Sequence, residues 1–236
     1  MVEQGHKITE SVKRVWNVFF NPEKTFSSLG EKITWKDLWF PVLLLVLASM
    51  VTIQLTHPIQ VKESTQMIAR LDNLTDQQKE VMLQRLSPDK VPIQNLIMGG
   101  LTPIISAFFI AVIYLFVGNF FGGGYAKYIT LLATTLYISM VDVLASIVKV
   151  PIMLAQQTMM VHTSLAMFFP DFDLGNVWFR LAMQVDIFKI WKWILWIIAF
   201  KVIYHYSPKK AFILTGIIWL LGAIFTVIIQ GYSIIA

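Results

Sequence analysis

Residues 211–236 read AFILTGIIWLLGAIFTVIIQGYSIIA and contain no charged side chain. A helix needs about 20 mainly apolar residues to cross a hydrocarbon layer about 30 Å thick. This stretch is long enough, and four further apolar stretches precede it. The sequence therefore predicts an all-α polytopic membrane protein with five transmembrane helices, which we place at residues 38–56, 93–121, 128–154, 185–206 and 211–236.

The composition of the 236-residue chain agrees with this class, since 56% of the residues are hydrophobic, 14% are charged and the mean hydropathy is +0.65. Soluble domains are usually about 45–50% apolar and about 25% charged. The absence of cysteine excludes a disulfide framework, a thiolate metal site and a cysteine nucleophile. The net charge of +5 comes without a basic block, so we assign it to lysines beside membrane spans and expect no nucleic-acid partner.

Residues 1–37 are polar enough to lie outside the bilayer, ahead of a membrane domain at residues 38–236. Tryptophan and phenylalanine along one side of a helix, with Lys13 and Arg14 largely opposite, are typical of a helix in the headgroup plane. We therefore expect an amphipathic interfacial helix on the cytoplasmic face. Its apolar stripe follows helical spacing and includes Val12, Val15, Trp16 and Phe19.

The longest polar stretch is the loop at residues 57–92, whose five basic residues balance five acidic ones. We expect it to form a small helical hairpin on the extracytoplasmic side. Lysines in short turns favour the cytoplasmic side, and Lys127, Lys209 and Lys210 lie in such turns without acidic neighbours. The chain is therefore expected to start in the cytoplasm and to end outside. Residues 156–184 fit either a re-entrant segment or a surface helix.

Asp142 falls near the middle of the third predicted span, and Lys149 follows two helical turns later on the same face. A carboxylate near the bilayer centre costs about 2.5–3.5 kcal/mol on insertion scales, so it needs a partner or a proton. We favour a structural ion pair with a lysine of the fourth span, Lys189 or Lys192. A protonated or water-lined aspartate, and a relay that transports an ion or solute, stay open as alternatives.

The start of the fourth span gathers charged and aromatic side chains, namely Asp186, Lys189, Trp191, Lys192, Trp193 and Trp196. Tryptophan rings prefer headgroup depth and lysine stems reach toward water, so this cluster is typical of an interfacial anchor. A binding site for a lipid headgroup, built from the same residues, is the alternative.

Sequence motifs of common enzymes are absent from the chain. It has no Gly-x-Ser-x-Gly, no His-Glu-x-x-His and no phosphate-binding loop of the Gly-x-x-x-x-Gly-Lys-Ser/Thr type. Its four histidines are far apart and lack the spacing and acidic companions of a metal site. We therefore expect no enzymatic activity, no cofactor and no metal.

Three motifs of the chain resemble the Yip1-domain family of membrane proteins. They are Phe20-Asn21-Pro22-Glu23-Lys24-Thr25-Phe26, Gly122-Gly123-Gly124-Tyr125-Ala126-Lys127-Tyr128, and Asp186-Ile187-Phe188-Lys189-Ile190-Trp191, which is followed by a Ser-Pro-Lys-Lys-Ala turn. The resemblance extends over nearly the whole chain. It departs from the family at Val141, which stands where a Tyr-x-x-x-Pro pattern beginning at Tyr137 would have proline.

The resemblance implies five membrane helices and no catalysis. Eukaryotic relatives are similar in being trafficking factors that bind small prenylated GTPases, and some bacterial relatives are encoded beside ABC-type export pumps. The short ends of this chain look more like the prokaryotic branch, which implies a bacterial plasma membrane. We therefore expect a non-catalytic partner or organiser of other membrane proteins, such as an accessory of an ABC-type exporter or of membrane trafficking. Association between copies of the chain is left open.

Overall fold

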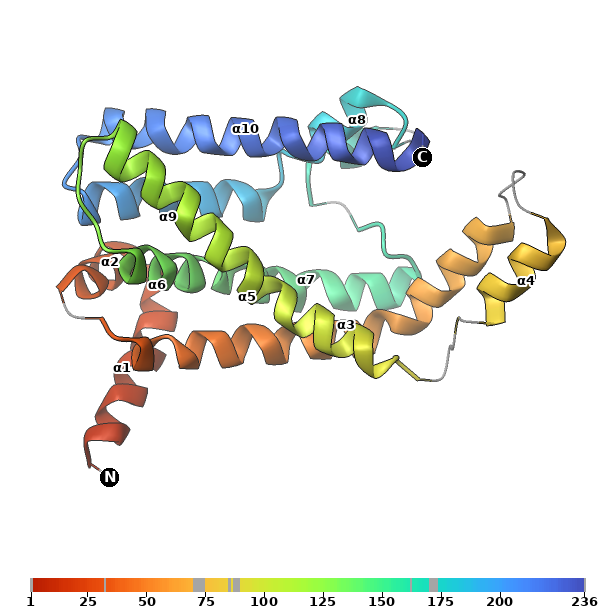
Figure 1. The fold of residues 1–236 in the computed structure, drawn as a ribbon, viewed down its shortest axis with the longest axis horizontal. Helices are drawn as coiled ribbons and strands as arrows, with labels where there is room; N and C mark the ends of the chain where they lie inside the picture. Colours follow the sequence, from red (N-terminus) through yellow and green to blue (C-terminus); the bar gives the residue numbers. More distant parts are fainter. Residues whose placement is uncertain are drawn as a thin grey trace. The chain divides into compact units, whose positions relative to one another are not determined.

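A computed structural model describes residues 2–31, 33–69, 75–84, 86, 90–161, 163–169 and 174–235. Every regular element within these residues is helical (Figure 1). The ten α-helices in this part of the chain are α1 (Val2–Phe20), α2 (Pro22–Glu31), α3 (Trp39–Ala69), α4 (Asp76–Gln84), α5 (Ile93–Phe116), α6 (Tyr128–Ile138), α7 (Met140–Gln156), α8 (Val177–Ala182), α9 (Ile187–Ile203) and α10 (Pro208–Ile235). Three shorter helical segments are η1 (Trp35–Asp37), η2 (Val117–Phe121), which is of the π type, and η3 (Leu165–Phe168).

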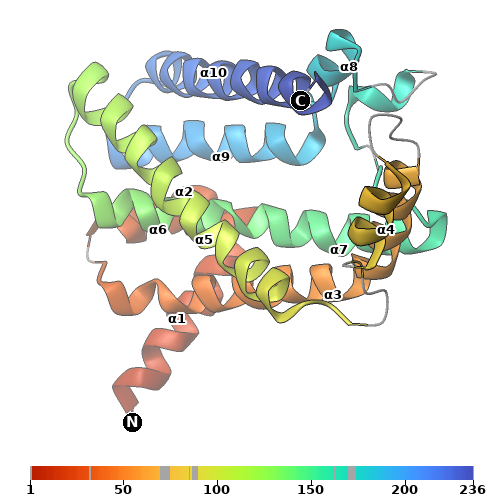
Figure 2. The same cartoon turned by 45° about the vertical axis from the view of Figure 1, so that its right-hand side comes forward.

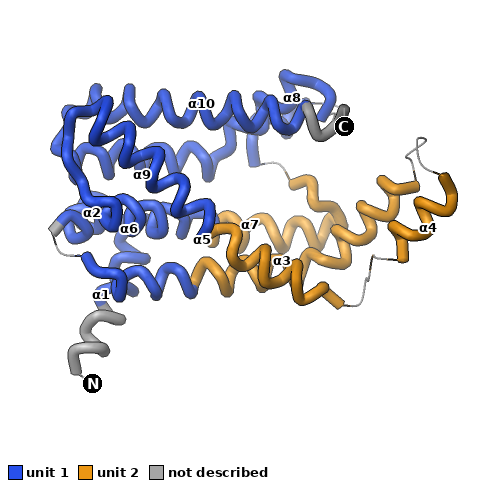
Figure 3. The backbone as a smooth tube through the Cα atoms, viewed as in Figure 1, with its two compact units in different colours: residues 1–43, 104–142, 162–236 blue, residues 44–103, 143–161 orange. Residues whose placement is uncertain are grey.

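The helices form two compact units (Figure 3). Unit 1 comprises Met1–Leu43, Ile104–Asp142 and His162–Ala236, and unit 2 comprises Leu44–Pro103 and Val143–Val161. Helices α3, α5 and α7 continue from one unit into the other.

The core of unit 1 forms where α2, α6 and α9 meet. Phe26 and Leu29 of α2, Leu131 of α6 and Phe200 of α9 are all fully buried. Helices α9 and α10 lie side by side in opposite directions, because a short turn joins them (Figure 2). Since α2 packs on α9, the first 37 residues do not form a unit of their own.

Unit 2 is held by contacts of α3 with α5 and with the end of α7. Gly99 of α5 has no side chain at a point where a Cβ would collide with Ile53 of α3. The Oε1 atom of Glu63 accepts hydrogen bonds from the hydroxyl of Thr158 at 2.7 Å and from the N–H of Met159 at 2.9 Å. Helices α3 and α5 are therefore held by close approach at Gly99, and α3 is held to the end of α7 by the carboxylate of Glu63.

Four helical stretches in the described chain are long and apolar enough to cross a membrane, namely Trp35–Ala69, Ile93–Phe121, Tyr128–Gln156 and Pro208–Gly231. They coincide with four of the five predicted spans. The remaining predicted span, at residues 185–206, falls on α9, whose 17 residues lie at the lower end of the roughly 17–25 that a crossing takes. The all-helical membrane class is confirmed, and the number of five crossings stays a prediction.

The first predicted span ends later than expected. Helix α3 continues to Ala69, past His57 and Pro58 where the sequence predicts its close. Proline inside a helix removes one backbone hydrogen bond. Beyond it Ile59, Val61 and Ile68 are buried, and this apolar packing offsets the missing bond.

The third predicted span is interrupted at Ser139, between α6 and α7. The hydroxyl of Ser139 donates to the backbone oxygen of Thr135 at 2.9 Å, and that of Thr135 donates to the oxygen of Leu131 at 2.8 Å. Hydroxyls that bond to the preceding turn often bend helices. The break thus forms without the proline that Val141 replaces.

The structure describes part of the predicted outer hairpin and part of segment 156–184. The end of α3 and α4 are helical, but residues 70–74 between them lie outside the described residues, so the hairpin stays a prediction. Between α7 and α9 the described residues form η3 and α8, of four and six residues, in place of one long helix.

Candidate functional site

An ion pair joins α7 to α9 within unit 1. The Nζ atom of Lys192 lies 2.9 Å from each carboxylate oxygen of Asp142. Charge-assisted hydrogen bonds of this kind are about twice as strong as neutral ones. The side chain of Asp142 is 52% exposed and that of Lys192 is 32% exposed. The ion pair is therefore formed, and both of its side chains stay partly exposed at the surface of the chain.

The position of Asp142 along its span makes this pairing important. Asp142 lies at the midpoint of the apolar stretch Tyr128–Gln156, in the first turn of α7. An isolated charge at the centre of a bilayer costs several kcal/mol. The ammonium of Lys192 neutralises the charge of Asp142 and so lowers this cost. The third predicted polar residue, Lys149, is half-buried further along α7 and belongs to unit 2.

Asp186 fixes the start of α9 and is buried. Its Oδ1 atom accepts hydrogen bonds from the N–H groups of Phe188 at 2.8 Å and Lys189 at 3.3 Å, the arrangement of a helix N-cap. Its Oδ2 atom accepts a 2.5 Å hydrogen bond from the hydroxyl of Thr163. Asp186 therefore ties the start of α9 to the segment before η3.

Lys189 contributes to the same end of α9. Its ammonium donates to Oε1 of Gln184 at 2.8 Å and to the backbone oxygen of Met183 at 3.2 Å. Both charged groups at this helix end are thus engaged by the protein itself.

Two of the predicted anchor tryptophans lie against other helices of unit 1. Trp196 is buried and stacks on Tyr114 of α5, with ring centres 3.5 Å apart. The Nε1–H of Trp193 donates to the hydroxyl oxygen of Thr215 in α10 at 3.1 Å. The structure therefore does not gather the tryptophans into one surface belt, because Trp196 is taken up by α5 and Trp193 bonds to α10.

Helix α1 has a buried side and an exposed side. Val18 is fully buried, and the ring of Phe19 meets Trp191 of α9 edge-on with ring centres 5.7 Å apart. Val15, like Phe19, is half-buried. Among the side chains of α1 whose burial is described, residues 10–20, the large apolar ones left exposed are Val12, Trp16 and Phe20. These three side chains form an exposed apolar stripe, which is the part of the predicted interfacial helix that can contact lipid or another protein.

Arg14 holds α1 in place. Its Nε–H donates to the hydroxyl of Ser28 in α2 at 3.1 Å, and its Nη1 atom lies 3.8 Å from Oδ1 of Asp37 in η1. The hydroxyl of Thr25 donates to the backbone oxygen of Arg14 at 3.4 Å. The exposed stripe is therefore carried by a helix that is fixed to the rest of unit 1.

A junction that sequence reasoning missed lies at the turn between α9 and α10. A Cβ at Gly118 or at Gly122 would collide with the ring of Tyr204 or of Tyr206. The hydroxyl of Tyr206 donates to the backbone oxygen of Gly118 at 2.5 Å. The ammonium of Lys210 donates to the oxygen of Gly122 at 2.6 Å and lies 4.2 Å from the centre of the Tyr206 ring. Glycines and tyrosines are visible in the sequence, but no spacing signals that they meet.

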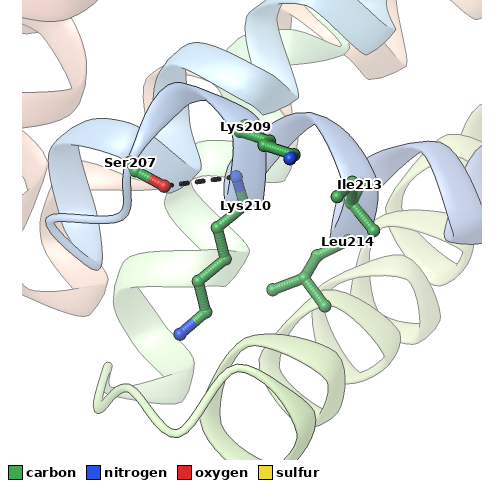
Figure 4. Close-up of a pocket in the computed structure, with 5 residues that line it drawn as sticks. All are labelled: Ser207, Lys209, Lys210, Ile213 and Leu214. Carbon is green, nitrogen blue, oxygen red and sulfur yellow. Dashed lines mark hydrogen bonds between the residues drawn. The ribbon is translucent and has the colours of Figure 1, made fainter.

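A small pocket of about 250 Å³ adjoins this turn (Figure 4). It is lined by Ser207, Lys209, Lys210, Ile213 and Leu214. The hydroxyl of Ser207 accepts a 3.3 Å hydrogen bond from the N–H of Lys210 in the first turn of α10. Because Gly122 engages the ammonium of Lys210, the pocket offers mainly apolar walls and Lys209.

These arrangements are suited to contact between helices. Asp142, Lys192 and Lys189 are each engaged by a charged or polar group of the protein, and many large apolar side chains are exposed. Within the described residues, no group of three or more histidine, aspartate or glutamate side chains is placed to hold a metal ion.

Comparison with known proteins gives one result. A family model described as Yip1 domain matches residues 16–229, which is nearly the whole chain. No curated protein and no solved structure matches the chain.

Proposed function

The chain belongs to the Yip1 domain family of membrane proteins, and from this premise we propose that it is a non-catalytic partner or organiser of other membrane proteins. In this proposal it crosses a bacterial plasma membrane five times, with its N-terminus in the cytoplasm. Assistance to an ABC-type exporter or to membrane trafficking is the form of the role that the family suggests.

The exposed surface of α10 is the observation that carries the proposal. Helix α10 packs on α9 and α8, and only 11% of its most apolar stretch is buried. At Gly222 nothing in the described chain comes within 4 Å of the position that a Cβ would take. Small residues on a membrane helix let a second helix approach closely. This surface supports contact with a transmembrane helix of another protein.

Co-purification from native membranes in mild detergent tests this role. The substitution Gly222→Ile fills the open position on α10, whereas Gly30→Ile makes the same change on α2, where a Cβ also meets nothing within 4 Å. We expect Gly222→Ile to lower recovery of the partner at least about tenfold, equivalent to about 1.4 kcal/mol, and Gly30→Ile to leave it unchanged. Equal recovery with both variants would contradict a contact through Gly222.

Transport of an ion or solute past Asp142 is the second candidate, because half of that side chain is exposed. The pairing with Lys192 supports a structural role, since both oxygens of the carboxylate are already engaged. The two candidates differ in purified protein reconstituted into vesicles. A partner protein shows no ion flux with either wild type or Asp142→Asn, whereas a transporter shows flux that Asp142→Asn removes while the fold is retained.

A further inference from the structure

Two short helices of unit 1, η3 and α8, carry an apolar surface that the proposed function does not use. They pack on each other, with Ala166 and Phe179 fully buried and the ring of Phe169 edge-on to Phe179 at 5.8 Å. Six large apolar side chains on their outward side are each at least 39% exposed, and we call them the apolar patch: Leu165, Met167, Phe168, Val177, Trp178 and Leu181.

The apolar patch is held in place by hydrogen bonds. The N–H of Leu165 donates to the oxygen of Val185 at 3.1 Å, next to the start of α9. Arg180 donates from Nη1 to the oxygen of Leu174 at 2.7 Å, and the side chain of Asn176 caps α8. Because the backbone that carries the patch is bonded, the exposure of these side chains is a property of the fold.

The contact of α8 with α10 gives the depth of the patch. The Nη2 atom of Arg180 lies 3.1 Å from the position that a Cβ would take at Gly231. At 1.5 Å per residue, Gly231 lies about 34 Å along α10 from Pro208. The hydrocarbon core of a bilayer is about 30 Å thick. A helix that enters the membrane at Pro208 therefore reaches the opposite headgroup layer at the level of α8.

The last turns of α10 also carry exposed apolar side chains, at Phe225, Ile228 and Ile229. The patch therefore lies at the depth where the apolar surface of α10 reaches the headgroup layer. Phe168 and Trp178 are its most exposed members, at 76% and 69%, and aromatic side chains are enriched at this depth. An exposed apolar patch on a fixed surface marks a contact with a partner or a membrane.

We infer that η3 and α8 form an interfacial anchor, which inserts the apolar patch into the lipid leaflet at the Gly231 end of α10. The anchor depends on the membrane location of the chain and not on its role as a partner. It lies outside the cluster at positions 186–196 that the sequence singles out, and it gives the segment between α7 and α9 a function in placing the ends of α9 and α10.

Site-directed spin labelling tests the anchor directly, because the chain has no cysteine and single-cysteine variants need no other change. The variants Phe168→Cys and Trp178→Cys are labelled in full-length protein in phosphatidylcholine–phosphatidylglycerol vesicles. Collision with oxygen reports apolar surroundings, and collision with a water-soluble nickel chelate reports water. Phe225→Cys on α10 serves as the lipid control, and Gln77→Cys, at an exposed position of α4, as the water control.

We expect the ratio of collision rates, oxygen over nickel chelate, to be at least about threefold higher at both patch positions than at Gln77→Cys. The ratio should approach that of Phe225→Cys. Values equal to those of Gln77→Cys would overturn the anchor and place the patch in water. Low accessibility to both reagents would also overturn it, because protein, such as a second copy, would then cover the patch. Met167→Cys replaces any variant that does not elute like wild type.

Discussion

The two ends of α9 are fixed by different physical means. At the Asp186 end, carboxylates and ammonium groups make hydrogen bonds, and the Asp142–Lys192 pair lies within the next two turns. At the Tyr204 end hydrogen bonds to Gly118 and Gly122 also form, but these glycines leave space for tyrosine rings, so the fit depends mainly on shape. Polar contacts tolerate a substitution that keeps the hydrogen bonds, whereas a close approach tolerates no added atom. The shape-dependent end should therefore be the more sensitive to mutation.

The largest effect is expected from Gly118→Val at the Tyr204 end. Any Cβ at this position collides with the ring of Tyr204, and forced overpacking typically costs about 1–3 kcal/mol or more. We expect a loss of about 3 kcal/mol, measured as a lower midpoint of thermal unfolding in detergent. Gly222→Val is the control, because its Cβ meets open space. Equal midpoints for the two variants would show that the Tyr204 end is not fixed by shape.

The next effect concerns the ion pair. Removing one partner of a buried pair costs about 3–5 kcal/mol, and the partial exposure of Asp142 and Lys192 reduces this to about 1–2 kcal/mol. We expect Asp142→Asn and Lys192→Met each to destabilise the protein by that amount and the double variant to lose less than the sum. A double-mutant cycle of unfolding measures this coupling. Additive losses would mean that the two charges do not stabilise each other.

A smaller effect is expected at the N-cap of α9. Replacing a capping aspartate by alanine costs about 1 kcal/mol, whereas asparagine is nearly as good a cap. Asp186→Ala should therefore lower the unfolding free energy by about 1 kcal/mol and Asp186→Asn by much less. If both variants lose the same amount, the charge of Asp186 matters more than its capping bonds.

The smallest effect is expected at the exposed ion pair between Lys201 and Glu23, whose charged atoms are 3.5 Å apart. Exposed pairs of this kind contribute about 0–1 kcal/mol. Lys201→Ala should change the unfolding midpoint only slightly, and less at high salt. A loss as large as that of Asp186→Ala would show that this pair helps to fix the Tyr204 end.

Features that depend on local pattern could be predicted from the sequence. Long apolar stretches identify four spans. A carboxylate at the centre of one of them requires a cation, for which the sequence offers Lys149, Lys189 and Lys192. The helical spacing of apolar residues likewise identifies α1, with Trp16 exposed as a membrane-surface helix requires.

Features that depend on which helices meet could not be predicted. Trp196 is a residue type typical of an interfacial anchor, but it stacks on Tyr114 of α5 and is buried. The contact of Gly118 with Tyr204 joins residues from separate segments, and neither residue type has a required partner. The apolar patch on η3 and α8 was missed because each of these segments is too short to show a period.

The central claim is that this membrane protein crosses the bilayer five times, with the short helix α9 as the fourth of the five crossings. Cysteine accessibility on either side of α9 tests it most directly. Gln156→Cys, at the end of α7, and Lys209→Cys, at the start of α10, are reacted with a membrane-impermeant maleimide in sealed vesicles of known orientation. The account predicts that the two positions react from opposite sides of the membrane. Reaction of both from the same side would contradict it.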